Sequence, residues 1–542
     1  MPLDKPASDV WTLLADWASQ TPDAPALLHG DRAMSFAELA ERSLRVAQGL
    51  ADLGVGRSDR VALWLPNVPA YLLLYFACTR LGAIAVAVNT RYRAVEVADI
   101  VSRSGAKVLA CAPAFRHIDF LSILAEIEPR ALDALKALVV VGDVPAETPA
   151  AIERLQRVPF DRLLTRPRRG TNDAGAKAVC NIFTTSGTTS APKFVAHRQG
   201  AIAAHAQQVA RVFGLAAADT LSLSIMPLCG VFGFNQTLTT LAAGRPCVLV
   251  ESYDIDTIAG LIQHHRPTTL LGSDDMFDRL LERMPGERPM PSVRWAGYAG
   301  FNTALESIAE TAERRGLLLR GLYGMSEVQA LYAAQPLEAP TARRKKGGGI
   351  PTSPLAHVRV RDPESGALLG PGQPGMLECA GPSLMVGYWG NDKATADAVT
   401  PDGYVRTGDL GELDPDGGFT FLSRMGDVLR LSGFLVNPLE IETHIQKLPG
   451  IAACQTIALA RPGGVRAVSF VILGAGTALD EGAVIAHCQQ GLANYKVPLR
   501  VFAIDDFPKT PSPNGFKIQR NKLRDMAEGL MGAHPSSGAH ES

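Results

Sequence analysis

The chain has 542 residues, of which 46% are hydrophobic and 20% charged, so it has the composition of a folded globular protein too long for a single core. Its formal net charge of −1 excludes the strong positive field that attracts nucleic acid or an anionic membrane. The eight cysteines lie far apart without a Cys-x-x-Cys pair, which indicates buried thiols in a reducing compartment. The first residues have neither a basic region nor an apolar run, so we expect a cytoplasmic protein without a membrane span.

A helix is expected to begin at Ser35, because Glu38 follows three residues later in a capping-box pattern and apolar residues then recur at helical spacing. Apolar strands and helices alternate after it. The predicted strands cover 60–67, 83–89 and 107–112, and the predicted helices cover 70–82 and 95–105. This βαβαβ order is typical of a parallel sheet with helices on both faces, and the same alternation returns over 245–273.

Gly and Pro concentrate between Lys345 and Gly375, where short hydrophobic runs at 357–362 and 375–380 predict antiparallel strands in a small β-rich subdomain. The last part of the chain has the pattern of an α+β unit. Its predicted helices cover 438–450 and 483–493, and its predicted strands cover 454–460 and 467–473. We therefore expect an α/β fold with a large N-terminal domain over 1–425, a small C-terminal domain over 426–530 and a disordered tail over 531–542.

The stretch TTSGTTSAPK, from Thr184 to Lys193, has no apolar periodicity and is predicted to be an exposed loop. Its backbone N–H groups, hydroxyls and one ammonium are donors that suit a phosphate group, although a flexible polar linker has the same composition. The sequence contains no Walker A motif, no H-E-x-x-H and no G-x-S-x-G, and its histidines lack metal-ligand spacing. These absences argue against a zinc enzyme or a serine hydrolase.

Four further motifs follow this loop along the chain. They are YGMSE (323–327), DGYVRTGDL (402–410), SRMGDVLRLSGFLVNPLEIE (423–442) and NGFKIQR (514–520). Taken singly they are weak, since Asp409 could be a turn residue, Glu327 a helix N-terminal charge and Lys517 a surface lysine. In this order and spacing the five motifs resemble those of the adenylate-forming superfamily, which includes acyl-CoA synthetases, firefly luciferase and peptide-synthetase adenylation domains.

The resemblance is strongest to a medium-chain or aryl acid–CoA ligase, and it implies two steps. A carboxylate attacks the α-phosphate of ATP and expels pyrophosphate, and a thiol then attacks the acyl-adenylate. The resemblance assigns Mg²⁺ to Glu327 and the ribose to Asp409 and Arg424. It assigns the adenine and the α-phosphate to Tyr323, Gly324 and Ser326. The residues that it assigns to the pyrophosphate side of ATP are Thr184, Thr185, Ser186, Gly187, Thr188, Thr189 and Lys193. Lys517 matches the cation between the two reacting anions, Gly426 the hinge of a mobile C-terminal domain, and Gly433 the thiol channel.

The resemblance also implies which residues line the acid pocket: Cys229, Gly230, Phe232, Asn235, Gly297, Tyr298 and Met325. Asn235 stands where amino-acid activators usually have an aspartate, which disfavours an α-amino acid because its ammonium would be buried unpaired. Tyr298 would shorten the pocket if it points inward. The sequence departs from the family pattern at Ser190, Gly230, Gly426 and Phe516, and the small Gly230 would leave room for a bulky acid.

The leading interpretation is an AMP-forming acid–thiol ligase that uses ATP, Mg²⁺ and CoA on a small carboxylic acid, without a nucleic-acid partner and as a monomer or homodimer. A freestanding adenylation enzyme that loads a carrier protein is one alternative. A nucleotide-binding protein without catalysis is the other, although every charged catalytic position is filled. The sequence does not identify the acid.

Overall fold

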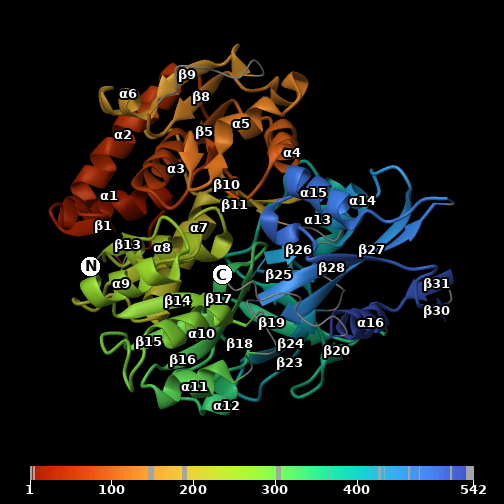
Figure 1. The fold of residues 1–542 in the computed structure, drawn as a ribbon. Coiled ribbons are helices and arrows are strands. Elements are labelled where there is room, and N and C mark those ends of the chain that lie inside the picture. Colours follow the sequence, from red (N-terminus) through yellow and green to blue (C-terminus); the bar gives the residue numbers. More distant parts are fainter. Residues whose placement is uncertain are drawn as a thin grey trace, which may run out of the picture. The chain divides into compact units, whose positions relative to one another are not determined.

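The computed structural model describes residues 3, 6–143, 152–185, 192–300, 305, 307–363, 365–424, 429–432, 434–436, 438–461, 464–474, 476–512 and 515–532. The chain divides into two compact units, whose elements are labelled in Figure 1. The larger unit contains most of the chain up to residue 425, and the smaller contains the chain after it together with Arg91–Glu96.

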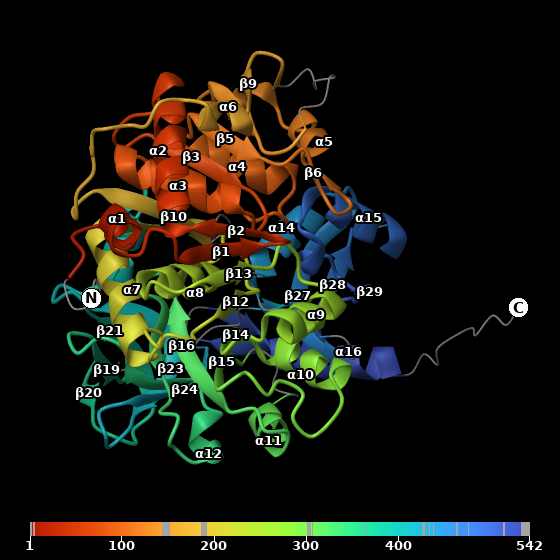
Figure 2. The same cartoon turned by 90° about the vertical axis from the view of Figure 1, so that its left-hand side faces the viewer.

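An eight-stranded sheet forms one part of the larger unit. Its strands, in spatial order, are β22 (Gly387–Tyr388), β11 (Lys193–Arg198), β10 (Val179–Thr185), β4 (Ile84–Ala87), β3 (Arg60–Trp64), β5 (Val108–Cys111), β8 (Ala137–Val140) and β9 (Gln156–Pro159). The strands from β10 to β9 are parallel, and β11 and β22 are antiparallel additions. Helix α3 (Pro69–Leu81) packs on β3 and β4, and α2 (Phe36–Asp52) packs on α3 (Figure 2).

A fourteen-stranded sheet forms the other part. Its order is β2 (Arg32–Ser35), β1 (Pro25–His29), β13 (Cys247–Leu249), β12 (Ser222–Ser224), β14 (Thr269–Ser273), β15 (Trp295–Ala299), β16 (Leu319–Met325), β17 (Gln329–Ala334), β18 (Gly348–Pro351), β24 (Phe419–Arg424), β23 (Val405–Leu413), β21 (Gly375–Ala380), β19 (His357–Arg361) and β20 (Leu368–Leu369). Strands β1 to β16 run parallel, and those from β17 onward are antiparallel. The predicted antiparallel strands therefore extend a parallel sheet.

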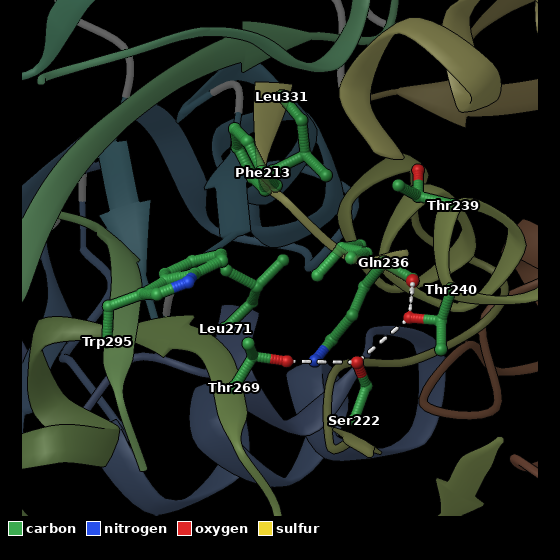
Figure 3. A pocket seen from close by; sticks show the side chains of 10 residues that line it. Phe213, Ser222, Gln236, Thr239, Thr240, Thr269, Leu271, Trp295 and Leu331 are labelled. Atoms are coloured by element: carbon green, nitrogen blue, oxygen red, sulfur yellow. Dashed lines mark hydrogen bonds between the residues drawn. The ribbon is translucent and has the colours of Figure 1, made fainter. Parts of the chain in front are cut away.

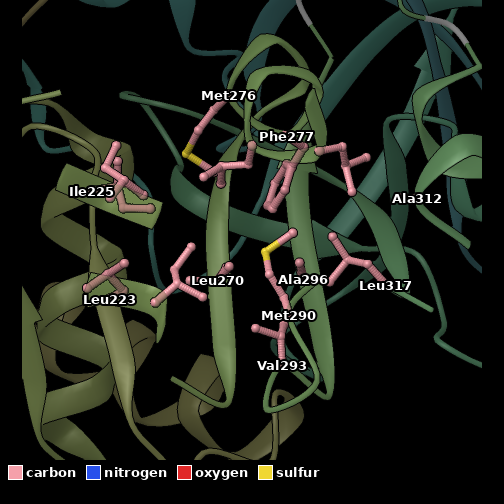
Figure 4. Close-up of a cluster of buried hydrophobic side chains, with 14 of the residues drawn as sticks. Leu223, Ile225, Leu270, Met276, Phe277, Met290, Val293, Ala296, Ala312 and Leu317 are labelled. Carbon is pink, nitrogen blue, oxygen red and sulfur yellow. The ribbon is translucent and has the colours of Figure 1, made fainter. Parts of the chain in front are cut away.

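The parallel half of this sheet has two different faces, because successive side chains of a strand point to opposite sides. Leu223, Leu270 and Ala296 lie on one face, in a hydrophobic cluster with Phe277 and other residues of three helices (Figure 4). These helices are α9 (Ile255–His265), α10 (Asp274–Arg283) and α11 (Ile308–Arg314). The other face is covered by α7 (Gln199–Val212) and α8 (Val231–Ala242), which contact β17 and β12 respectively.

The remaining elements of the chain up to residue 425 are short or peripheral. The helices are α1 (Val10–Gln20), α4 (Ala94–Ser104), α5 (Phe120–Ala125), α6 (Phe160–Leu164), α12 (Thr341–Arg344) and α13 (Asp392–Ala398), and β6 (Ala114–Phe115) pairs with β7 (Ile118–Asp119). No helix among the described residues is long and apolar enough to cross a membrane.

The smaller unit is built on a three-stranded sheet with its own core. The strands are β27 (Ile451–Arg461), β28 (Gly464–Leu473) and β29 (Arg500–Ala503); the helices are α14 (Pro438–Ile445), α15 (Glu481–Gly491) and α16 (Arg520–Gly532); and two hairpins pair β25 (Leu429–Leu431) with β26 (Phe434–Val436) and β30 (Lys509–Ser512) with β31 (Gly515–Ile518). Leu523 and Ala527 of α16 pack against Ile457 and Phe470 of the sheet. This contact packs α16 against the three-stranded sheet.

Candidate active site

Tyr323 and Asp409 meet between two strands that are far apart in sequence. The Tyr323 hydroxyl donates a hydrogen bond to Asp409 Oδ2 at 2.7 Å, and the Asp409 side chain is buried. The Tyr323 ring lies edge-on to Phe419, with 5.0 Å between ring centroids. Asp409 also stands opposite Arg424 in the β23–β24 register. A buried carboxylate beside an arginine position is chemistry suited to a ribose diol.

Glu327 belongs to a second polar cluster, together with Tyr388 and Lys193. The sequence motifs predict Glu327 and Lys193, and the structure adds Tyr388. Glu327 Oε1 accepts a hydrogen bond from the Tyr388 hydroxyl at 2.8 Å, and its Oε2 has no hydrogen-bond partner among the described residues. Burial, and then the Glu327 charge, raise the pKa of Tyr388 far above its usual range, so Tyr388 remains a donor. Lys193 Nζ lies 4.6 Å from the centroid of the Tyr388 ring. The lysine that ends the predicted phosphate loop is thereby linked to the predicted metal-side carboxylate.

The segment that carries Tyr323, Ser326 and Glu327 is held in an unusual backbone conformation. Gln329 and Leu331 adopt positive φ values of 71° and 65°, which non-glycine residues rarely do. A side chain at Gly324 would place its Cβ 2.6 Å from the Cα of Ala330, so this position requires glycine. The close packing therefore fixes where the YGMSE motif stands.

Two buried histidines bond the carbonyl groups of this segment. His197 Nε2 lies 2.7 Å from the Ser326 carbonyl oxygen, and His205 Nε2 lies 2.7 Å from that of Ala330. Burial lowers the pKa of each imidazole to about 4, so both are neutral at physiological pH and donate from Nε2. Neither histidine belongs to a recognisable motif, and the sequence alone did not identify them.

Helix α8 carries most of the predicted acid pocket. Gly230 is its N-cap, Cys229 is buried just before it, and Phe232 is half-buried in its first turn. Asn235 is fully buried, and its Nδ2 donates to Gln329 Oε1 at 2.8 Å. Asn235 therefore lies beside Gln329, in the backbone segment that follows the YGMSE motif. Met325 of that motif is half-buried.

Gly297 and Tyr298 are neighbours on β15 and point to opposite faces of the sheet. At Gly297 a Cβ would lie 2.8 Å from both Leu271 Cδ2 and Leu322 Cδ1, so the glycine permits close packing on the α8 face. Tyr298 belongs to the hydrophobic cluster on the other face, and its hydroxyl donates to the Lys345 carbonyl oxygen at 2.8 Å. Tyr298 therefore does not point inward on the α8 face, and the expected shortening of the pocket by this ring is absent there.

Several predicted residues cannot be placed by their side chains. Ser186, Gly187, Thr188, Thr189, Ser190, Gly426 and Gly433 lie outside the described residues, as does most of the predicted tail. Arg424 and Lys517 are placed only by their backbone, on β24 and β31. The predicted phosphate loop is shorter than expected, because Thr184 and Thr185 end β10 and Lys193 begins β11. The Thr184 hydroxyl donates to the Ala87 carbonyl oxygen at 3.2 Å.

Within the smaller unit, a buried ion pair holds the start of α16, three residues after Lys517. Glu442 is buried on α14, and its Oε1 accepts hydrogen bonds from the Thr456 amide at 2.8 Å and from Arg520 Nη2 at 3.0 Å. Burial raises the pKa of Glu442, and the two donors oppose that rise. The pair ties the first residue of α16 to α14.

Known proteins are similar to this chain in sequence and in fold. The chain matches the AMP-binding enzyme family over residues 14–389 and the AMP-binding enzyme C-terminal domain over residues 440–513. It belongs to the AMP-binding enzyme family. A feruloyl-CoA synthase from an Amycolatopsis species is 31% identical over 521 residues, which are 94% of this chain and 96% of the relative. A 2-hydroxy-7-methoxy-5-methyl-1-naphthoate–CoA ligase from Streptomyces carzinostaticus is 28% identical over 533 residues, which are 95% of this chain and 92% of the relative.

A solved structure agrees with the sequence relatives. A variant of o-succinylbenzoate CoA synthetase from Bacillus subtilis, bound to a product analogue, has a TM-score of 0.81 and 23% identity, with 95% of this chain and 98% of that chain covered. This similarity shows the shared fold. The predicted superfamily, the α/β fold class and the activity class are confirmed: the chain is an AMP-forming acid–CoA ligase that uses ATP, Mg²⁺ and CoA on a small carboxylic acid.

Tyr388 is a further residue of this AMP-binding enzyme that sequence reasoning missed, and the structure brings it to the site. It lies on β22, which pairs with β11 at Val195, and 61 residues separate it from Glu327. Its local sequence, VGYWGN, reads as an ordinary turn. Only the pairing of β22 with β11 could have indicated it, and that pairing leaves no short-range signal.

Proposed function

We propose that this AMP-binding enzyme activates a ring-containing carboxylic acid and that α8 selects it. The observation that carries the proposal is on α8, where Asn235, Gln236, Thr237, Thr239 and Thr240 are all at most 2% exposed. Three atoms of this set, Asn235 Oδ1, Gln236 Oε1 and Thr239 Oγ1, have no hydrogen-bond partner among the described residues. A pocket wall for a long alkyl chain would be apolar, since each buried polar group needs a hydrogen-bond partner. A flat acid with oxygen substituents can supply such partners.

The related enzymes support this choice of substrate class. By name, one acts to make feruloyl-CoA and another takes a hydroxylated, methoxylated naphthoate, and both cover more than nine-tenths of this chain. Gly230 and Gly297 leave the α8 face without bulky side chains at two positions. The neutral amide of Asn235 cannot form an ion pair with a substrate ammonium, which disfavours an α-amino acid.

The site residues divide the first step among them in this proposal. Asp409 and Arg424 hold the ribose, Tyr323 and Gly324 flank the adenine, Ser326 lies near the α-phosphate, and Thr184 to Lys193 bind the departing pyrophosphate. Glu327 fits Mg²⁺, because this ion takes few carboxylates and keeps its waters, and Oε2 has no partner among the described residues. Bound there, the ion would neutralise charge on the phosphate oxygens.

In this proposal the smaller unit takes part in both steps. Lys517 offsets the repulsion between the carboxylate and the α-phosphate in the first step, and Gly433 lines the path of CoA in the second, with Gly426 as the hinge. The carboxylate oxygen forms a bond to the α-phosphorus as the bond to pyrophosphate breaks. The CoA sulfur then bonds to the acyl carbon, and AMP leaves.

We also propose a cytoplasmic location. All eight cysteines are buried free thiols, and burial raises the pKa of Cys78 and Cys111 to about 12, so they remain unreactive thiols rather than thiolates. A reducing compartment is the environment in which such a set of thiols is common.

The test is pyrophosphate release from ATP with a panel of acids, measured with and without CoA. Benzoate, cinnamate and naphthoate derivatives should be activated, with formation of the CoA thioester, and octanoate should be a poor substrate. Turnover of octanoate alone would contradict the substrate class. Adenylate that accumulates with CoA present and is consumed only when a carrier protein is added would contradict CoA as the acceptor.

A further inference from the structure

A small, partly open cavity lies between α8 and the polar face of the fourteen-stranded sheet (Figure 3). It has room for about one water-sized group. Its walls combine apolar and polar side chains, which are Phe213, Leu215, Ser222, Gln236, Thr239, Thr240, Thr269, Leu271, Trp295 and Leu331. A small space with several polar walls can hold a hydrogen-bonding group but would be a poor site for a hydrocarbon.

Most polar groups around the cavity satisfy one another. Ser222 Oγ lies 3.0 Å from Thr269 Oγ1 and 3.0 Å from Thr240 Oγ1, and these hydroxyls form a continuous chain (Figure 3). The Ser224 and Thr237 hydroxyls, further along the same two elements, are 2.6 Å apart. These pairs explain why a buried helix can carry so many threonines without a ligand.

Two atoms do not fit that explanation. Gln236 Nε2 donates to the Leu223 carbonyl oxygen at 2.7 Å, which fixes the orientation of the amide and leaves Oε1 as an acceptor. Gln236 Oε1 and Thr239 Oγ1 are buried and have no hydrogen-bond partner among the described residues. A buried polar atom without a partner is destabilising, so its presence in a cavity indicates that something fills it.

Three residues that line the cavity are neighbours of residues in or beside the predicted acid pocket. Gln236 follows Asn235 on α8, Leu331 is two residues after Gln329 on β17, and Leu271 reaches to within 2.8 Å of where a Gly297 side chain would be. A substrate that lies against Asn235 and Gly297 would therefore have its end farthest from the carboxylate near this cavity.

The chemistry of the walls selects the group. Gln236 Oε1 needs a donor, and Thr239 Oγ1 can donate or accept, so a hydroxyl group has the chemistry to pair with either atom. An ammonium is disfavoured, because Phe213 and Trp295 on the opposite wall stack on the buried guanidinium of Arg320, whose Cζ is 4.2 Å from each ring centroid. A second cation would meet this charge in a medium of low dielectric constant.

We infer that this cavity receives a hydroxyl group on the end of the acid farthest from its carboxylate, with Gln236 and Thr239 as the residues that recognise it. The inference rests on the proposed function, since it names the substituent of the ring acid that α8 selects. A site built to bond a hydroxyl discriminates strongly against the analogue without it, because its own polar groups are then left unpaired.

The test compares matched pairs of ring acids, such as 4-hydroxycinnamate with cinnamate and 6-hydroxy-2-naphthoate with 2-naphthoate, by kcat/KM for pyrophosphate release. The unmodified enzyme should prefer the hydroxylated member of at least one pair by tenfold or more. Thr239→Val should reduce that ratio by about tenfold, and Thr239→Ser, which keeps the hydroxyl, should restore most of it. Thr237→Val is the matched control: it is the same substitution on the same helix, away from the cavity, and should leave the ratio unchanged.

Each contrary outcome has a distinct meaning. If ring acids are activated but no pair shows a preference, or if Thr239→Val and Thr237→Val change the ratio equally, the hydroxyl inference is wrong and the proposed function stands. If no ring acid releases pyrophosphate, the proposed function is wrong and the inference falls with it. A structure with a hydroxylated acyl-adenylate bound and only a water molecule in the cavity would also overturn the inference.

Discussion

The two faces of the same parallel strands differ sharply. On the face toward α9, α10 and α11, the strands contribute Leu223, Leu270 and Ala296, and the cluster around them is hydrophobic. On the face toward α7 and α8 lie Ser222 and Thr269, which precede Leu223 and Leu270 in the sequence. They belong to a network of hydroxyls and amides. An apolar face needs only close packing, whereas a polar face must satisfy every buried group. We therefore expect the apolar face to contribute most to stability, and we propose that the polar face contributes to recognition of the acid.

Breaking the apolar face should have the largest effect. Phe277 is fully buried in its cluster, so Phe277→Ala leaves a cavity and should lower the free energy of unfolding by about 3–5 kcal/mol. Urea unfolding measures the change. The acid preference of the folded variant should equal that of the unmodified enzyme, and a shift in preference would show that the two faces are not separable.

Low pH should destabilise the polar side of the protein through its buried histidines. The pKa of His205 is lowered to about 4 in the folded chain, against an ordinary value of 6.5, so its contribution is present above pH 6.5 and is lost as the pH falls toward 4. Each such histidine adds at most about 1.4 kcal/mol per pH unit to the slope in this window. His205→Phe should reduce the slope of unfolding free energy against pH by that amount. An unchanged slope would mean that His205 is not buried as a neutral group.

Asp409 extends the comparison to the antiparallel half of the sheet, where ATP is proposed to bind. Asp409→Asn should lower kcat/KM for ATP by a factor that corresponds to a loss of about 1.5–3 kcal/mol in binding free energy, because the charge-assisted bonds to the ribose are lost. The loss should be equal for every acid, since the ribose is common to all of them. A variant that changes the order of preference among acids and leaves the ATP dependence alone would remove Asp409 from the nucleotide site.

The smallest effects sharpen the comparison within α8 itself. Thr237 is bonded to Ser224, so Thr237→Val should lower the free energy of unfolding by about 1 kcal/mol. The Thr239 hydroxyl has no partner among the described residues, so Thr239→Val should raise it by a similar amount, about 1 kcal/mol, in the absence of substrate. Thermal or urea unfolding of the two variants side by side checks the opposite signs. Equal losses would mean that the Thr239 hydroxyl is satisfied by water.

The fold was predictable where local signals are strong. Ser35 caps α2 and accepts a hydrogen bond from the Glu38 amide, as the capping-box pattern predicts, and the alternation over 60–112 appears as β3, α3, β4, α4 and β5. The antiparallel pairing of the predicted strands at 357–362 and 375–380 is confirmed by β19 and β21. These features depend on neighbouring residues, so the sequence carries them directly.

The site was predictable only in part. Motif residues could be named singly, but the bond from Tyr323 to Asp409 spans 86 residues, and the one from Tyr388 to Glu327 spans 61. Likewise, the period-two pattern of β15 does not say which of Gly297 and Tyr298 faces α8, because both faces of a parallel strand are buried. Partner strands and helices decide such contacts, and no short-range pattern records them.

The most direct test of the account is a crystal structure of the enzyme with a non-hydrolysable acyl-adenylate analogue made from its best ring acid. The account predicts that the ring lies against Asn235 and Gly297, with its far end toward Gln236 and Thr239, and that Asp409 contacts the ribose. An acyl group bound on the α9–α11 face, or directed away from α8, would contradict the assignment of recognition to the polar face.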